Sequence, residues 1–228
     1  MPLSPLQQIR LDMDRAADAA GRPHAQLLAV SKTQPAEAVA ALAAQGQRAF
    51  GENYVQEAAA KIAALAEAGL EWHLIGHLQS NKAELAATLF HWVQTVDRPK
   101  LVAALAKGRT AASAPLNVLI QVNIDDEASK HGCQPDAVDA LAAAIAAQPT
   151  LALRGLMAIP APWPEAERRI DAFARMHALF ARLRAAHPQV DTLSMGMSGD
   201  FADAIAAGAT MVRVGTALFG ARGPRVAG

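Results

Sequence analysis

One lysine in this sequence stands where a reactive amine would be useful. Lys32 closes a candidate strand over residues 27–32, directly after the apolar run Leu-Leu-Ala-Val, whereas the other lysines lie in helical stretches or polar loops. Partial desolvation at such a strand end favours the neutral amine, which is the form that attacks a carbonyl to give a Schiff base. The alternative interpretation is a lysine that simply reaches solvent from the end of a strand.

Two small-residue segments near the C-terminus suit an anion. Met197, Ser198 and Gly199 follow one apolar run, and Gly215 and Thr216 follow the next. Small residues let backbone N–H groups approach an anion, and a helix N-terminus adds a favourable dipole. Glycines of this kind can also make simple tight turns, but two such segments at consecutive strand ends predict a phosphate site.

Arg213 and Asn53 are further polar residues in candidate strands. Arg213 lies within the apolar run 211–215, where an unpaired guanidinium would be costly. It either bonds to structural acceptors or donates to a ligand. Asn53 ends the run 48–53, and its amide either orients a ring substituent or caps the following helix.

The histidine spacing does not predict a metal site. His73 and His77 lie four residues apart, but Gly76 interrupts them in a segment typical of a strand that runs into a turn. The sequence offers no evident third ligand, so we predict no metal site. Cys133 is the only cysteine, which excludes an intrachain disulfide and any site built from several cysteines.

The composition narrows the class of protein. Of 228 residues, 21 are Lys or Arg, 21 are Asp or Glu, and 52% are hydrophobic. The balanced charge argues against a nucleic-acid binder, and the hydrophobic fraction is enough for a sizeable core. The N-terminal segment carries charges throughout, and no window approaches about 18 uncharged apolar residues. We therefore expect a cytoplasmic protein that binds neither nucleic acid nor membrane.

Eight short apolar runs alternate with alanine-rich segments of helical spacing. An extra helix is expected near residues 5–19. Proline and glycine bound several helical segments, as Pro35 and Gly46 do, and Asp97 is a candidate N-cap. The candidate strands cover residues 27–32, 48–53, 71–76, 91–96, 117–123, 151–159, 192–196 and 211–215.

This alternation predicts an α/β protein with a parallel sheet. A doubly wound open sheet usually has five or six strands, whereas eight repeats in this length fit a (β/α)8 TIM barrel. We expect one domain over residues 1–228, with a frayed tail at 221–228. The active sites of such barrels lie at the carboxyl ends of the strands. A lysine, an arginine and an anion-binding loop at that end suit an aldehyde-bearing, phosphorylated cofactor, pyridoxal 5′-phosphate (PLP).

Several sequence blocks together carry a family resemblance. The blocks are AVSKTQP, FGENYVQE, WHLIGHLQSNK, VNIDDEASKHG, GLMAIPAP, LSMGMSGD and AIAAGATMVRVGTALFGAR. From about residue 5 to residue 222 the chain closely resembles the pyridoxal-phosphate homeostasis protein family. The resemblance implies a fold-type III PLP-binding barrel, similar to the barrel domain of alanine racemase but without the second, β-rich domain of that enzyme.

The resemblance also implies how the cofactor is held. Lys32 would form the internal aldimine, Arg213 would face the pyridine nitrogen, and Asn53 would lie beside the ring. His77 stands where many members have a proline, which removes none of these contacts.

The same family resemblance assigns binding of the phosphate to the two small-residue segments. Ser198, Gly215 and Thr216 would bind it, helped by backbone amides near Met197 and Gly199. Gly199 stands where an acidic residue is common in the family, and this departure could loosen the phosphate loop.

The sequence also argues against strong catalysis. PLP enzymes drain a carbanion into a protonated pyridinium, and an arginine opposite the ring nitrogen weakens that sink. Racemisation needs an acid or base on each face of the substrate, and Tyr54 is the only tyrosine. We therefore expect a monomeric, non-catalytic protein that holds PLP in vitamin B6 homeostasis, with PLP-dependent apoenzymes as candidate recipients. Two alternatives are a PLP-dependent amino-acid racemase of the same barrel type and a Schiff-base aldolase that uses Lys32 without a cofactor.

Overall fold

A closed barrel of parallel strands forms the centre of the computed structural model, which describes residues 2–110, 113–127, 131–161 and 163–220. The strands are β1 (Gln26–Val30), β2 (Ala49–Glu52), β3 (Glu71–Leu74), β4 (Trp92–Val96), β5 (Leu116–Val122), β6 (Leu151–Ala158), β7 (Thr192–Met197) and β8 (Met211–Val214). They follow one another around the barrel in chain order, and β8 closes the ring by pairing with β1. The prediction of an eight-stranded α/β barrel is confirmed.

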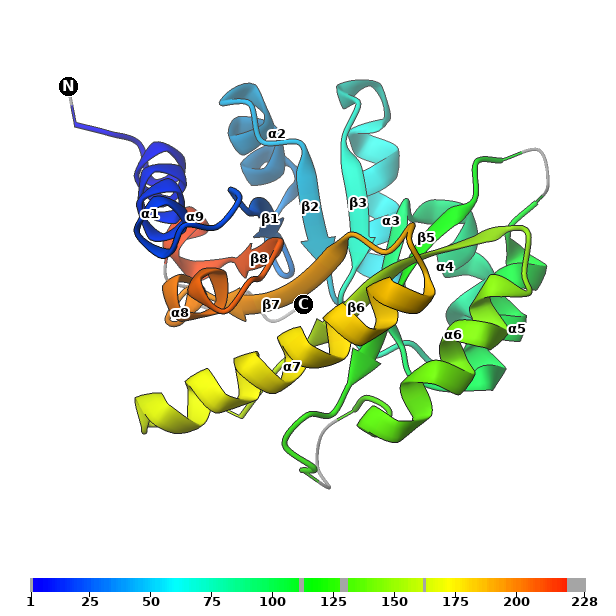
Figure 1. The fold of residues 1–228 in the computed structure, drawn as a ribbon. Helices are drawn as coiled ribbons and strands as arrows, with labels where there is room; N and C mark the ends of the chain where they lie inside the picture. The colour runs from blue at the N-terminus through cyan, green and yellow to red at the C-terminus, as the bar shows by residue number, and fades with distance from the viewer. Residues whose placement is uncertain (1, 111–112, 128–130, 162, 221–228) are drawn as a thin grey trace.

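Helices alternate with the strands and surround them, as Figure 1 shows. The α-helices are α1 (Pro5–Ala20), α2 (Ala36–Ala44), α3 (Val55–Ala64), α4 (Ala83–Leu89), α5 (Pro99–Gly108), α6 (Val138–Ala146), α7 (Ala166–Ala186), α8 (Phe201–Ala206) and α9 (Thr216–Phe219). Three short 3-10 helices are η1 (Ala66–Ala68), η2 (Ser80–Lys82) and η3 (Pro135–Ala137). The expected extra helix is α1, which lies beside α8 and α9 in Figure 1. Among the described residues, every helix is too short or too polar to cross a lipid bilayer.

Local sequence signals explain where several helices begin and end. Ser4 and Gln7 form a capping box at the start of α1, and Gly21 ends this helix in the left-handed conformation. Gly46, with φ of 93°, turns the chain after α2 as expected. The prediction for α5 was wrong in one detail, because Arg98 rather than Asp97 occupies the N-cap position. The predicted frayed tail at 221–228 lies outside the described residues.

The first strand ends two residues earlier than predicted. The 27–32 run was expected to remain extended, but β1 ends at Val30. The carbonyl of Ser31 accepts hydrogen bonds from Lys61 Nζ at 2.7 Å and from the Gln34 amide at 3.0 Å, so the chain turns there. Lys32 therefore lies in the turn just beyond the strand end.

Alternation along the strands sorts side chains between the barrel interior and the helix layer. Leu28 and Met211 pack in a small cluster that contains no helical residue, whereas Leu27 and Ala29 belong to the large cluster shared with the helices. The even-numbered positions of β1 thus face the interior. Lys32 follows this strand in the turn at its carboxyl end, which is the end that opens into the mouth of the barrel.

Candidate functional site

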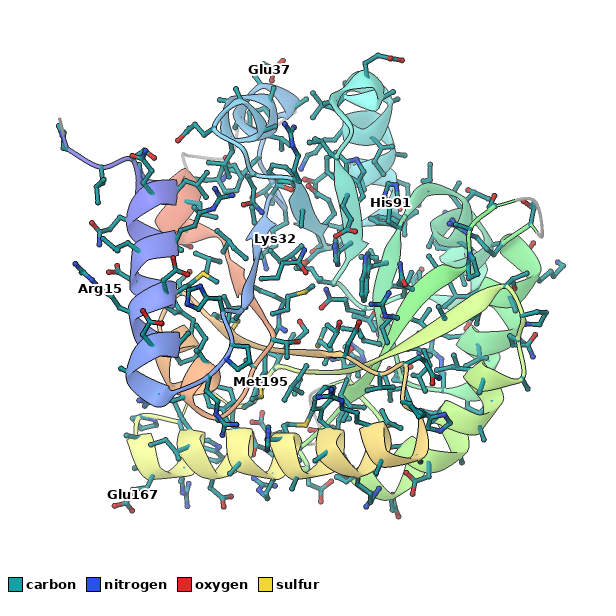
Figure 2. All side chains as sticks on the ribbon, turned by 45° about the horizontal axis from the view of Figure 1, so that its top comes forward. Arg15, Lys32, Glu37, His91, Glu167 and Met195 are labelled. Carbon is teal, nitrogen blue, oxygen red and sulfur yellow. The ribbon has the colours of Figure 1, made fainter. Side chains whose placement is uncertain are left out.

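Lys32 lies just beyond the carboxyl end of β1, at the mouth of the barrel. Its side chain is half-buried and makes no hydrogen bond or ion pair with any residue that the structure describes. In Figure 2 it lies inside the ring of helices, whereas Glu37 and Glu167 lie on the outside of the molecule. The amine is therefore unengaged at the mouth of the barrel, and a Schiff-base lysine requires an unengaged amine.

A buried ionic cluster fixes the backbone on both sides of Lys32. Besides the Ser31 carbonyl, Lys61 Nζ contacts one carboxylate oxygen of Glu52 and one of Glu57, each at 2.8 Å. Ser31 Oγ donates to the same Glu52 oxygen at 2.6 Å, and the Thr33 amide donates to Glu57 at 2.6 Å. Lys61 belongs to a helical stretch in the sequence, so its role in holding this turn is visible only in the fold.

Arg213 is the inward-facing charged residue of β8. Its Nη1 donates to Ser194 Oγ and its Nη2 to the Ala158 carbonyl, each at 2.7 Å, while its Nε has no partner among the described residues. Burial lowers the pKa of the Arg213 guanidinium to about 10, with the carboxylate of Asp200 acting in the opposite direction. The guanidinium stays charged at neutral pH and is held firmly, so both sequence interpretations, a structural arginine and a ligand donor, are compatible with its contacts.

A chain of hydrogen bonds continues from Ser194 through the barrel interior. Ser194 Oγ donates to Gln94 Oε1 at 2.7 Å, and Gln94 Nε2 lies 3.0 Å from His73 Nδ1. His73 Nε2 lies 2.8 Å from a carboxylate oxygen of Glu71. One consistent direction satisfies every pair, with each group donating to the next from Arg213 to Glu71.

The segment after β7 is built from small residues, as predicted, but one of its amides is already engaged. The Met197 amide donates to the Asp200 carboxylate at 2.6 Å, so it does not face a ligand in this conformation. The amides of Ser198 and Gly199 have no hydrogen-bond partner among the described residues. These two amides are therefore the available anion donors of this turn.

The segment after β8 lies against the end of β1. A Cβ atom on Gly215 would lie 3.2 Å from the Val30 carbonyl oxygen, so the lack of a side chain permits this close approach. Thr216 begins α9, and the amides of Thr216 and Ala217 have no partner within the described part of the chain. The fold thus brings Gly215 and Thr216 to the strand end next to Lys32.

Asn53 follows β2 at the same end of the barrel. It lines a cleft of about 470 Å³ together with Tyr54 and His77. Gly76 lies so close to the Asn53 backbone that a Cβ atom there would be 2.1 Å from the Asn53 oxygen. Tyr54 is 60% exposed, so the one tyrosine of the chain is not enclosed beside Lys32.

The fold therefore gathers the predicted residues at the carboxyl ends of neighbouring strands. Lys32 follows β1, Asn53 follows β2, Met197, Ser198 and Gly199 belong to the end of β7 and its loop, and Arg213, Gly215 and Thr216 belong to β8 and the segment after it. Sequence reasoning missed the residues that support them, chiefly Gln94, Ser194 as a hydrogen-bonding partner, and Lys61. A polar residue at an inward position of an apolar strand was the available signal for the first two.

Comparisons with known proteins agree with this arrangement. Residues 5–223 match the family model described as alanine racemase, N-terminal domain. The chain is 53% identical over 222 residues to the pyridoxal phosphate homeostasis protein of Escherichia coli, covering 95% of each chain. It belongs to the pyridoxal phosphate homeostasis protein family. The resemblance that the sequence blocks indicated is thereby confirmed.

Solved structures include a protein of similar size and fold. PipY of Synechococcus elongatus, without PLP, is 37% identical, with a TM-score of 0.85 over 95% of this chain and 98% of that chain. PipY with PLP bound gives a TM-score of 0.79 over 91% of this chain and 99% of that chain. Alanine racemase from Corynebacterium glutamicum is 22% identical, with a TM-score of 0.65, and this chain covers 62% of it, so it shares the barrel fold of this homeostasis-protein chain.

Proposed function

We propose that this chain binds PLP at the carboxyl-end mouth of the barrel and takes part in PLP homeostasis. The observation that carries the proposal is that Lys32 directly follows β1 and Arg213 lies on β8, two strands that pair with each other. Leu28 of β1 pairs with Arg213 of β8, so the lysine and the guanidinium line the same sector of the mouth. The names of the relatives, and the PLP bound to PipY, support the choice of ligand.

The donor set fits the chemistry of PLP. When bound, this cofactor supplies an aldehyde that condenses with a primary amine and a ring that can delocalise negative charge. Lys32 would attach the aldehyde as a Schiff base, because its amine is unengaged at the mouth. Arg213 would donate its free Nε–H toward the ring nitrogen, and Asn53 would lie beside the ring.

The phosphate would lie between the segments after β7 and β8. The free amides of Ser198 and Gly199, the backbone of Gly215 and the first turn beginning at Thr216 all offer donors to an anion. Met197 would contribute through its position in the turn, since its own amide is bonded to Asp200. Barrels commonly bind phosphate at these two strand ends.

We infer that the chain holds and hands over PLP with little turnover of its own. A guanidinium that remains charged opposite the ring nitrogen would keep this nitrogen unprotonated and the electron sink weak. The exposed Tyr54 offers no enclosed second acid or base. PLP-dependent apoenzymes are the proposed recipients, and an accessible mouth suits such a transfer.

The covalent part of the proposal is tested by absorbance and mass mapping. Protein titrated with PLP is expected to develop an imine absorption band, and borohydride reduction is expected to fix the cofactor on Lys32. Lys32→Ala should lose both, whereas Lys82→Ala, a matched change at a lysine of the neighbouring cleft, should keep both. A colourless protein with no adduct on Lys32 would overturn the Schiff-base attachment of PLP, and a colourless protein is what a lysine-dependent aldolase would give.

The absence of substantial turnover is tested separately. Loaded protein is incubated with single enantiomers of alanine and serine, and the chirality of each amino acid is followed over time. Slow or no racemisation is expected. Rapid racemisation that disappears in Lys32→Ala would overturn the non-catalytic function and establish a PLP-dependent racemase.

A further inference from the structure

Three potential metal ligands meet at the mouth of the barrel, outside the proposed cofactor contacts. His77 follows β3, Asp97 follows β4, and His131 lies in the segment after β5. One ligand atom from each of these residues lies within 4.8 Å of the other two. They are far apart in sequence, and the order of strands in the barrel brings them together.

The ligand atoms of this cluster are available. The rings of His77 and His131 stack with centroids 3.6 Å apart and planes 15° from parallel. The ring nitrogens of both histidines have no hydrogen-bond partner among the described residues. Asp97 uses one carboxylate oxygen in a 2.5 Å contact with Arg98, and its other oxygen has no partner in the described part of the chain.

The backbone around His77 is held rigidly. The carbonyl of the preceding Gly76 accepts a hydrogen bond from Thr95 Oγ1 at 2.9 Å. The same glycine packs directly against the Asn53 backbone, where no side chain would fit. The position of His77 is therefore set by contacts to the strands on either side of β3.

The backbone around His131 is held in a similar way. Gln121 Nε2 donates to the His131 carbonyl at 3.2 Å, and the Cys133 amide donates to the Gln121 carbonyl at 2.9 Å. Between them, Gly132 has a φ of 122°, and a Cβ atom there would lie 2.6 Å from the Asn123 nitrogen. Only glycine tolerates both this positive φ and this close approach at position 132. The turn therefore holds His131 against β5.

Arg98 orients the third ligand. Besides its contact with Asp97, its Nη2 donates to the Leu78 carbonyl at 2.9 Å and to Ser80 Oγ at 3.4 Å. These bonds connect the loop that carries Asp97 to the loop that carries His77. Partners that hydrogen-bond to a ligating carboxylate in this way commonly tune the affinity of a metal site.

The chemistry of the donor set identifies the class of ion. Two imidazoles and one carboxylate suit a divalent first-row transition metal such as Zn²⁺ and do not suit the all-oxygen preference of Mg²⁺ or Ca²⁺. In a tetrahedral zinc site the ligand atoms lie about 3.3 Å apart, because each bond is about 2.0–2.1 Å. His77 and His131 are exposed, so their side chains have room to rotate toward the more buried Asp97.

We propose that His77, Asp97 and His131 form a binding site for a divalent transition-metal ion, with Zn²⁺ the best match. The sequence predicted no metal site because no third ligand was evident, and the fold supplies two ligands from distant segments. Bound metal would tie together the loops after β3, β4 and β5. Because His77 also lines the cleft beside Asn53, the ion would stiffen one wall of the mouth.

Binding of Zn²⁺ to the full chain without an affinity tag tests the proposal. Isothermal titration is expected to show one ion per chain in wild-type protein. His77→Ala, His131→Ala and Asp97→Asn should each weaken that binding by about tenfold or more. Co²⁺ gives a second readout, because its visible absorption bands should appear in wild-type protein and disappear in the three variants.

The matched control is His24→Ala. His24 is an exposed histidine between two carboxylates, 3.1 Å from Asp14 and 3.2 Å from Asp18, but its two ring nitrogens each contact a different acid. The control should keep the wild-type stoichiometry, affinity and Co²⁺ spectrum. Failure to bind one ion per chain, or equal losses in His24→Ala and His77→Ala, would overturn the site, and neither result depends on PLP.

Discussion

The Arg213 guanidinium donates through Nη1 to the Ser194 hydroxyl at 2.7 Å, inside the barrel. The same hydroxyl donates to Gln94 Oε1 at 2.7 Å, so one serine satisfies a charged donor and an amide acceptor from the opposite wall. The arginine proposed to face PLP is thus held by hydrogen bonds within the barrel interior.

Ser194→Ala should destabilise the protein and remove one hydrogen-bond acceptor of the Arg213 guanidinium. Loss of the hydroxyl leaves a charged donor and a buried amide oxygen without their partner, at a cost of about 1–3 kcal/mol in the free energy of unfolding. Urea denaturation measures the change. Ser113→Ala is the control, because within the described residues its hydroxyl bonds only to Thr110 at the surface. It should change stability by less than about 0.5 kcal/mol. Equal effects of the two substitutions would contradict the role of Ser194.

The buried His73 makes stability depend on pH. Burial lowers the pKa of His73, and hydrogen bonding to Glu71 opposes the shift. Its pKa in the folded chain therefore lies below the unfolded value of about 6.5. Acidification protonates the unfolded chain first, so stability is full above about pH 6.5 and falls as the pH decreases below it.

The pH dependence is measured by urea denaturation at about pH 7.5 and about pH 5.5. In His73→Gln the fall in stability should be smaller, by up to about 1.4 kcal/mol per pH unit, because one titrating group has been removed. His77 and His91 also have pKa values lowered by burial, so part of the slope should remain. An unchanged slope in His73→Gln would show that this imidazole does not titrate as expected.

Lys61 and Glu52 form a buried pair beside Lys32. Lys61→Met should cost about 3–5 kcal/mol of stability, because it leaves the Glu52 carboxylate buried without its cation. The Ser31 carbonyl also loses a donor, so binding of PLP to Lys32 should weaken. The double variant Lys61→Met/Glu52→Gln should recover much of the lost stability, since it removes the uncompensated charge.

The surface pair of Lys107 and Glu84 is the control for this buried pair. Its atoms lie 2.6 Å apart, but the side chains are 73% and 53% exposed. Lys107→Met should therefore cost at most about 1 kcal/mol and leave PLP binding unchanged. If the buried and exposed substitutions have similar effects, the cluster does not hold the Lys32 turn.

Features that depend on the local sequence could be predicted, whereas contacts between residues far apart in the sequence could not. Arg213 and the small-residue loops were predicted near the ends of β7 and β8, because strand alternation and the barrel pattern are local signals. Lys32 was predicted within a strand that in fact ends two residues earlier. The chain from Ser194 to Gln94 could not be inferred, because it requires that β7 and β4 face each other across a closed barrel. Lys61 was equally hidden, since a lysine within a helical stretch gives no sign that its amine is buried.

Two glycines of the β7 region should respond oppositely to alanine. A Cβ atom on Gly199 would contact nothing within 4 Å, so Gly199→Ala should stabilise the protein by about 0.4–1 kcal/mol through the unfolded chain. Gly196 has a φ of 91°, and its Cβ would lie 2.5 Å from the Ala204 Cβ. Gly196→Ala should therefore destabilise the protein by about 1–3 kcal/mol. Thermal unfolding of both variants checks the contrast, and stabilisation by Gly196→Ala would contradict it.

Arg213→Glu tests the proposed contact with the ring nitrogen of PLP. A carboxylate at this position should raise the proton affinity of the ring nitrogen, because it replaces a nearby positive charge with a negative one. The absorption band of bound PLP should shift relative to that of the wild-type protein. Arg213→Gln removes the charge without reversing it, so its shift should be smaller and in the same direction.

The control for charge reversal is Arg182→Glu on the outer surface of α7, where the side chain is 56% exposed. It should leave the PLP spectrum unchanged, because solvent screens a charge at that position. Reduction and mass mapping on Lys32 establish that each variant still carries the cofactor. A wild-type spectrum in loaded Arg213→Glu would remove this arginine from the ring-nitrogen position and leave it as a structural partner of Ser194.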